Sequence, residues 1–206
     1  MVPSNSQPKA IALVFMLMFS VGISADTLTI PDELSRAGVS LLHTVGDESG
    51  LPPTMTQILD ETDTVVKGKV GTPRSYLSDD RREIYTDYAI SNPEFLYESD
   101  VATSTRPGAV ATVTVTLLGG TMVFSGLSYT SRHVSLPSLE PATECLLLLK
   151  RVGSKYRIAG RYYGAFRIQD GKLAPLTSRQ GFASRYHGAS SAQVAEEMLA
   201  QLRARH

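Results

Sequence analysis

The sequence is poor in the residues that cross-link a small fold. Among its 206 residues there is one cysteine, Cys145, and there is no tryptophan. A single cysteine cannot form a disulfide within the chain, so stability must come from a hydrophobic core. Cys145 opens the apolar run CLLLL and follows Glu144, a setting that predicts a buried and unreactive thiol.

An excess of charge of either sign is also lacking. Lysine and arginine together number 20, and aspartate and glutamate together also number 20. A dedicated nucleic-acid-binding protein needs a basic field, which a neutral chain does not provide. We therefore expect no nucleic-acid partner.

Motifs for metal binding and for nucleophilic catalysis are missing from the sequence. The four histidines are scattered, and neither HExxH, HxH nor CxxC spacing occurs. The acidic residues of the segment 78–83 are interleaved with arginines, which predicts a solvated turn and not a calcium site. Neither a GxSxG motif nor a phosphate-binding loop is present. We expect no metal, no cofactor and no catalytic residue recognisable as a motif.

The N-terminal 25 residues have the pattern of a signal peptide. Residues 1–9 are polar with one positive charge, and residues 10–23 form an apolar run that is short for a bilayer-spanning helix. Small residues at 24 and 25 predict cleavage after Ala25; an uncleaved anchor is the alternative. We expect export to the periplasm or the cell exterior, with membrane contact only through this segment before cleavage.

The next segment, residues 26–53, is punctuated by proline and glycine and predicts an extended N-terminal arm. Thr54 and Gln57 then follow a Pro-Pro pair with the spacing of a capping box, which predicts a short helix over 55–60. A second capping box, Ser190 with Gln193, predicts a C-terminal helix over 192–205 after a polar linker that starts at 178.

Alternating apolar and polar residues predict several strands between the helices. They cover 64–70, 83–91 with a possible continuation over 94–97, 109–118, 121–129 and 173–176. A continuous apolar run predicts one more strand, 145–152, buried on both faces. The charged turn at 78–83 joins the first two strands in a hairpin, and glycine-containing turns at 119–120, 153–154 and 170–171 join later ones.

The stretch 156–168, YRIAGRYYGAFRI, alternates throughout its length and predicts one long strand. Gly160 and Gly164 lie four apart on its inward face, where glycine lets a strand bend and a sheet curl. Together these patterns predict a mainly β fold. It is a small antiparallel OB-like barrel over 54–177, with a short helix before the first strand and a C-terminal helix within 178–206.

Several segments resemble a group of secreted bacterial proteins with small OB-like β-barrels. The resemblance covers residues 62–168, and TDTVVKGKV, IYTDYAI, VTVTLLGG and CLLLLKRVGSKYRIAGRYYGAFRI carry it. The group is distantly similar to netrin-like inhibitor domains, but the disulfides of those domains are missing here. Its function is unassigned, so the resemblance implies a fold and not an activity.

The candidate binding residues lie on the outward face of the 156–168 stretch. They are Arg157, Arg161, Tyr163 and Arg167. Arginine beside an aromatic ring suits stacking and carboxylate recognition, and the sheet faces of OB folds bind extended ligands. The plain alternative is a charged outer face that keeps the sheet soluble. Lys67 and Lys69 would extend the basic face if their strand is adjacent.

The leading hypothesis is an exported, non-enzymatic module that binds a protein, a peptide or an envelope polymer through one sheet face. One alternative is a hydrolase whose site is assembled from distant residues such as Asp87, Ser128 and His133. Another is a structural or assembly partner that docks through its C-terminal helix.

Overall fold

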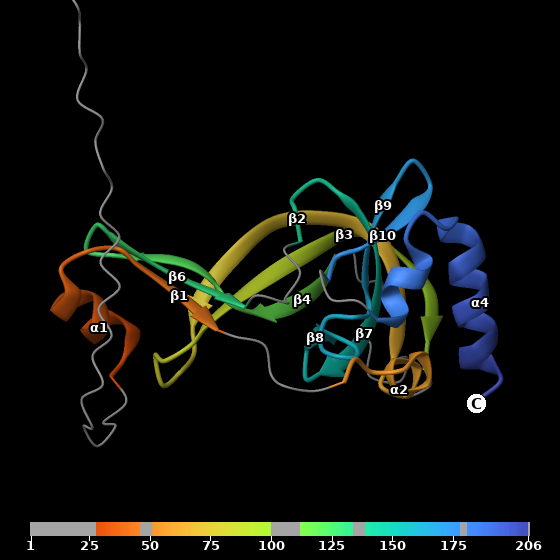
Figure 1. Cartoon of the computed structure of the whole chain (residues 1–206), viewed down its shortest axis with the longest axis horizontal. Coiled ribbons are helices and arrows are strands. Elements are labelled where there is room, and N and C mark those ends of the chain that lie inside the picture. The colour runs from red at the N-terminus through yellow and green to blue at the C-terminus, as the bar shows by residue number, and fades with distance from the viewer. Residues whose placement is uncertain (1–27, 46–50, 100–111, 134–138, 178–180, 206) are drawn as a thin grey trace, which may run out of the picture.

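The computed structural model describes residues 28–45, 51–99, 112–133, 139–177 and 181–205. The fold is mainly β, with a helix near the N-terminus and a C-terminal helix, as the sequence predicts. The strands form a seven-stranded sheet and a three-stranded sheet (Figure 1). The predicted signal peptide, the start of the predicted strand at 109–111 and the first linker residues lie outside the described residues.

The seven-stranded sheet has the order β10-β9-β7-β2-β3-β4-β8, and β7 also pairs with β8. Its pairings are antiparallel except that of β4 with β8, which is parallel and has one registered pair, Val115 with Tyr156. The strands are β2 Thr64–Leu77, β3 Ile84–Glu98, β4 Thr112–Leu118, β7 Glu144–Val152, β8 Lys155–Ile158, β9 Ala165–Gln169 and β10 Lys172–Pro175.

The predicted hairpin of the first two strands is confirmed; the first strand is longer than predicted, and the second has the continuation that the sequence left open. β2 has 14 residues and β3 has 15, and β3 continues through Pro93. Their pairing shifts register at three places, the last between Val70 and Pro73. Such bulges increase local twist and bend, so the hairpin curves along its whole length (Figure 1). The predicted first strand ends at Val70, whereas β2 continues through Gly71 and Pro73 to Leu77.

The prediction of one long strand over 156–168 is wrong. β8 ends at Ile158, the chain turns, and β9 begins at Ala165; both strands pair with β7. The turn has left-handed backbone at Gly160 and Arg161, with φ of 61° and 66°. A Cβ at Gly160 would also lie 2.5 Å from Cγ1 of Ile58, so α2 packs directly on this glycine. Alternation cannot reveal the break, because buried residues continue through the turn.

β7 is buried on both faces from Cys145 to Leu149; the predicted burial over 145–152 is correct for this part and wrong for Lys150 and Val152, which are exposed. On one face, inside the curved sheet, Leu147 and Leu149 pack with β2, β3, β4 and β8 residues. On the other face, Leu146 and Leu148 pack with the helices. Burial, with a smaller effect of the Glu144 charge, raises the pKa of the Cys145 thiol to about 12, in agreement with the predicted unreactive thiol.

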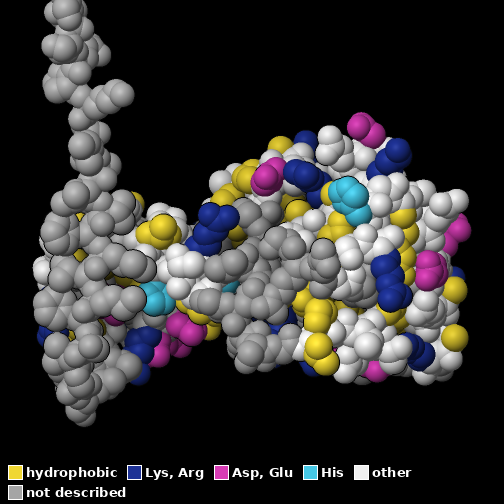
Figure 2. All heavy atoms as spheres, viewed as in Figure 1, with side chains coloured by type: hydrophobic (Ala, Val, Ile, Leu, Met, Phe, Trp, Pro, Cys, Tyr) yellow, Lys and Arg dark blue, Asp and Glu magenta, His cyan; other side chains and the backbone are white. Residues whose placement is uncertain are grey.

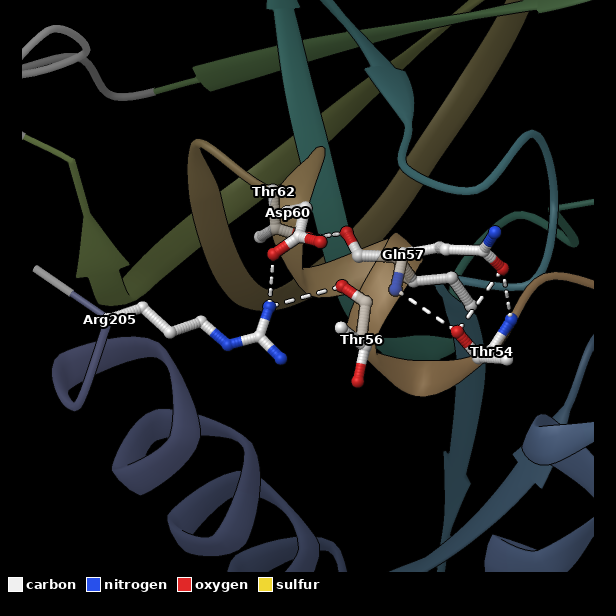
Figure 3. Close-up of polar contacts among 7 residues, drawn as sticks. Thr54, Thr56, Gln57, Asp60, Thr62 and Arg205 are labelled. Atoms are coloured by element: carbon white, nitrogen blue, oxygen red, sulfur yellow. Dashed lines mark hydrogen bonds and ion pairs between the residues drawn. The ribbon is translucent and has the colours of Figure 1, made fainter.

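The helix predicted over 55–60 is confirmed as α2, Met55–Asp60. Its capping box is also confirmed: the backbone N–H of Thr54 donates to Gln57 Oε1 at 2.8 Å, and the Gln57 N–H donates to Thr54 Oγ1 at 3.3 Å (Figure 3). Thr54 and Gln57 thus each accept a hydrogen bond from the other's backbone N–H at the start of the helix. The helix buries Ile58 and Leu59 in the core.

The C-terminal helix is α4, Ser191–Arg203, preceded by the short 3-10 helix η1, Phe182–Tyr186. The Ser190 side chain makes no cap hydrogen bond, so the second capping box is not formed. Four apolar residues of α4 are buried in the core: Val194, Ala195, Met198 and Leu202. Beyond the helix, Arg205 binds the Thr56 carbonyl and the Asp60 carboxylate of α2 (Figure 3).

The predicted extended N-terminal arm is wrong over its described part. Residues 28–45 contain α1, Ile30–Ala37, and β1, Leu41–Val45, which pairs in parallel with β6. The three-stranded sheet has the order β1-β6-β5 and lies with α1 at the far end of the β2–β3 hairpin (Figure 1). Its small core contains Ile30 and Leu34 of α1, Tyr129 of β6 and Ile84 of β3.

Gly119 and Gly120 carry the chain from one sheet to the other and do not make a hairpin. β4 stays in the large sheet, whereas the predicted strand 121–129 splits into β5, Gly120–Phe124, and β6, Leu127–His133. The Gly119 N–H donates to the Ile84 carbonyl at 2.7 Å. A Cβ at Gly120 would collide with the Thr86 hydroxyl, so only glycine fits where the chain crosses the hairpin.

Candidate binding face

The structure separates the four residues that the sequence placed on one strand face. Arg157 is exposed on β8, Arg161 is exposed in the turn, and Arg167 lies on β9 with an ion pair to Glu140 at 3.4 Å. Tyr163 is 1% exposed, so the prediction that its ring projects outward is wrong. The turn at Gly160 changes the phase of the alternation, which puts the side chain of Tyr163 into the core instead.

Lys67 and Lys69 of β2 do not extend a basic face, because their strand is not adjacent to β8 or β9. β2 pairs with β3 and β7, and with neither β8 nor β9. Lys67 instead forms an ion pair with Glu144 of β7 at 3.1 Å. The described structure therefore contains no continuous arginine–lysine face of the kind that the alternating pattern suggested.

A different set of polar and aromatic side chains comes together on the outer side of the large sheet. We call this set, Tyr76, Tyr85, Asp87, Lys155 and Arg157, the tyrosine–lysine face. Strand alternation explains it, because the residues between them on β3 and β8, Thr86 and Tyr156, point to the opposite side and are buried. Four strands meet here, since β2, β3 and β8 supply these residues and β4 lies between β3 and β8.

The carboxylate of Asp87 is the centre of the face. It accepts hydrogen bonds from Lys155 Nζ at 2.6 Å, from Thr116 Oγ1 at 2.6 Å and from the Tyr76 hydroxyl at 3.3 Å. The donors come from β8, β4 and β2, so one carboxylate links three strands to its own. Burial raises the pKa of Asp87, but hydrogen bonds from Lys155 and Thr116 outweigh it and bring the pKa below its ordinary value.

The ammonium group of Lys155 lies between the carboxylate and an aromatic ring. Its Nζ is 4.6 Å from the ring centroid of Tyr76 and donates to the Tyr76 hydroxyl oxygen at 3.1 Å. The hydrogen bond to Asp87 is the main cause that raises the pKa of Lys155. The side chain is 41% exposed, so this cation is fixed in position and still open to solvent.

The two tyrosine rings form a cross-strand pair. Tyr76 and Tyr85 are directly opposite in register, and their ring centroids are 6.0 Å apart. The Tyr85 hydroxyl donates to Glu83 Oε2 at 2.5 Å; this hydrogen bond, with burial, raises the pKa of Tyr85 to about 12. The positive charge of Arg157 acts on the same phenol in the opposite direction. Both rings are half-buried, which leaves part of each for a ligand.

Lys155 and Asp87 stabilise each other's charged forms. A lysine that acts as a base or nucleophile needs a lowered pKa, and the pKa of Lys155 is raised. The Asp87 carboxylate is already held by three donors. In the described part of the chain, no group of three or more histidine, cysteine, aspartate and glutamate side chains could hold a metal ion.

The residues named for a hydrolase are not brought together. Asp87 lies in the large sheet, whereas Ser128 and His133 lie on β6 of the small sheet. Five positions along a strand separate Ser128 from His133 by roughly 16 Å, far beyond the reach of a hydrogen bond. These three residues therefore cannot form a catalytic triad with one another.

Part of the face was accessible to sequence reasoning. Tyr85 and Asp87 alternate with inward residues of a predicted strand, and the hairpin turn at 78–83 would place Tyr76 opposite Tyr85. Tyr76 was missed because the predicted first strand ends at Val70, seven residues before the end of β2. Lys155 was missed because it lies between the predicted turn at 153–154 and the predicted strand from 156, and because its contact with Asp87 spans 68 positions.

Comparisons with protein-family models, with curated proteins and with solved structures each find no match to this chain. None of the helices in residues 28–205 that the structure describes is long and apolar enough to cross a membrane. The geometry of the face is therefore the basis for a functional proposal.

Proposed function

We propose that the protein is an exported, non-enzymatic binding module that recognises a protein, a peptide or an envelope polymer through the tyrosine–lysine face. One observation carries the proposal: Lys155 is fixed against both Asp87 and the Tyr76 ring and stays 41% exposed. A preorganised cation beside partly exposed aromatic rings loses little freedom when a ligand binds. Export rests on the signal-peptide pattern of residues 1–25.

The strand pairings support an OB-like barrel as the scaffold. β2 pairs with β3, β3 with β4, β4 with β8, β8 with β7, and β7 with β2, which makes a ring of five strands. In OB folds, ligands bind on the face of the second and third strands and on the adjoining loops. Counted around this ring in chain order, those strands are β3 and β4, which carry Tyr85, Asp87 and Thr116.

The adjoining loops of the ring also meet the tyrosine–lysine face. The loop between the first two strands, residues 78–83, contains Glu83, the partner of the Tyr85 hydroxyl. The turn between β7 and β8 is immediately followed by Lys155. The face and both loops coincide with the position at which OB folds bind ligands. Of the four binding residues predicted from the sequence, the proposed site includes Arg157 and does not include Arg161, Tyr163 or Arg167.

The test is recovery of partners from an envelope extract with wild type and two variants of the purified protein. Tyr76→Ala/Tyr85→Ala removes both rings from the face, and Arg161→Ala removes an exposed cation outside it. We expect the first variant to lose partners that wild type and Arg161→Ala retain. Equal recovery by all three proteins, with unchanged thermal melting, would overturn the proposed face.

A further inference from the structure

The outer side of the strands around the tyrosine–lysine face carries more positive than negative charge. Arg74 of β2 is in register with Asp87, and Lys150 of β7 is in register with Arg157, so each shares a face with its partner. Arg74, Lys150 and Arg157 are exposed. None of these three has an ion-pair partner among the residues that the structure describes.

The acidic groups of the same region already have partners within the chain. Asp87 is held by Lys155, and Glu83 accepts the hydrogen bond from Tyr85. A ligand would therefore meet three cations without counter-ions around two aromatic rings. Guanidinium groups match carboxylates with two parallel hydrogen bonds, which favours a ligand that carries carboxylate groups.

One common mode of peptide recognition is closed at β3, the central strand of this face. An added peptide strand needs an unpaired strand edge. β3 is paired with β2 on one edge and with β4 on the other from residue 85 to residue 91. A ligand over β3 is therefore recognised by side chains above the sheet, and the flat rings of Tyr76 and Tyr85 are suited to stacking on a sugar ring.

The carboxylates of Asp87 and of Glu83 beside the face favour a ligand that carries hydroxyl groups. Sugar hydroxyl groups can donate hydrogen bonds to Asp87 and Glu83 while sugar carboxylates accept from the arginines. Phosphate oxygens carry no proton, so a phosphodiester backbone offers these two acids no donor of this kind. The chain as a whole also has a formal net charge of 0, without the basic field of a nucleic-acid-binding protein.

We infer that the ligand of the tyrosine–lysine face is a polysaccharide that carries carboxylate groups, stacked on Tyr76 and Tyr85 and held by Arg157, Arg74 and Lys150. This inference rests on the proposed function of the face. It adds the chemical class of the ligand to the position of the site. The bound chain would lie across β2, β3 and β8, over the side chains that these strands present outward.

The experiment measures binding of defined oligomers to the whole exported chain by calorimetry. The probes are uronic-acid oligosaccharides, the same oligosaccharides with carboxylates reduced to alcohols, oligoglutamate and a single-stranded oligonucleotide. We expect the uronic oligosaccharides to bind, the reduced ones to bind about tenfold or more weakly, and added salt to weaken binding. Arg157→Ala should weaken binding about tenfold, and Arg161→Ala should leave it unchanged.

The possible failures separate the inference from the proposed function. Equal binding of charged and reduced oligosaccharides, sensitive to Tyr76→Ala/Tyr85→Ala, would overturn the carboxylate inference and keep the face. Preference for oligoglutamate or the oligonucleotide would overturn the sugar class in the same way. If no oligosaccharide binds but recovery of partners from the extract still requires Tyr76 and Tyr85, only the carboxylate-polysaccharide inference is overturned. If recovery of those partners does not require the two tyrosines, the proposed binding face is overturned as well.

Discussion

Asp87 on β3 and Lys155 on β8 form an ion pair across β4, with 2.6 Å between Oδ2 and Nζ. The other carboxylate oxygen accepts hydrogen bonds from Thr116 of β4 and Tyr76 of β2. A single acidic side chain thus connects residues between 11 and 68 positions away in the sequence. Its loss should affect both the fold and the face.

We expect Asp87→Ala to lower the free energy of unfolding by about 1–2 kcal/mol. The substitution leaves three donors without their acceptor, and partial exposure lets water replace part of the loss. Urea denaturation measures the change. Asp79→Ala, which removes an exposed acid from the charged turn, should stay within about 0.5 kcal/mol of wild type. Equal effects of the two substitutions would contradict the central role of Asp87.

The stabilisation by Asp87 should depend on pH in a defined direction. Burial raises the pKa of this carboxyl, but the hydrogen bonds from Lys155 and Thr116 bring it below the ordinary value of 3.8. Because the folded-state pKa is the lower one, the stabilisation is fully present above 3.8 and is lost as the pH falls through the folded-state value. The pKa of Lys155 is raised above 10.5, so the lysine stays charged throughout this range.

The measurement is the difference in unfolding free energy between wild type and Asp87→Asn as a function of pH. It should be constant from about pH 7 to about pH 5 and shrink in more acidic solution. A difference that grows on acidification would show that the folded-state pKa is raised and not lowered.

Gly160→Ala should destabilise the protein more than Gly153→Ala. Both glycines have left-handed backbone, with φ of 61° and 62°, so both substitutions carry a conformational cost of roughly 1 kcal/mol. Only at Gly160 would the new Cβ collide with Ile58; nothing lies within 4 Å of a Cβ at Gly153. The collision should add roughly 1–3 kcal/mol in urea denaturation. Similar costs at the two positions would mean that α2 does not press on the turn.

Met198→Ala tests whether the C-terminal helix belongs to the fold. Met198 is 0% exposed, and its truncation should cost about 2–5 kcal/mol because a cavity would remain in the core. Leu199→Ala, at the neighbouring and only half-buried position, should cost less. A helix that docks on a partner would give the opposite result in the isolated protein: both substitutions would leave the thermal melting temperature unchanged.

The sequence predicted those elements whose determinants are local. The capping box of Thr54 and Gln57 starts α2, the run of leucines makes β7, and Asp170 with Gly171 turns β9 into β10. In each case neighbouring residues determine the backbone, and tertiary packing only adds to the preference. The mainly β fold follows from the same local patterns.

Elements that depend on distant contacts were not predicted. β1 pairs in parallel with β6, and Leu41 lies opposite Tyr129, a partner that no turn signal connects to it. Tyr163 alternates correctly for an exposed position but is buried because the chain turns at Gly160. The tyrosine–lysine face was not predicted for the same reason, since Tyr76, Asp87 and Lys155 meet only once four strands are paired.

The single registered pair between β4 and β8 has a kinetic consequence. A junction with so few backbone hydrogen bonds should open locally at a lower free energy than the whole domain, so amide hydrogens of β8 should exchange with solvent early. The Asp87–Lys155 ion pair spans this junction from the outside. A ligand that contacts both Tyr76 and Arg157 would also span this junction. Its binding should therefore slow amide exchange in β8, even without contact between the ligand and the β8 backbone.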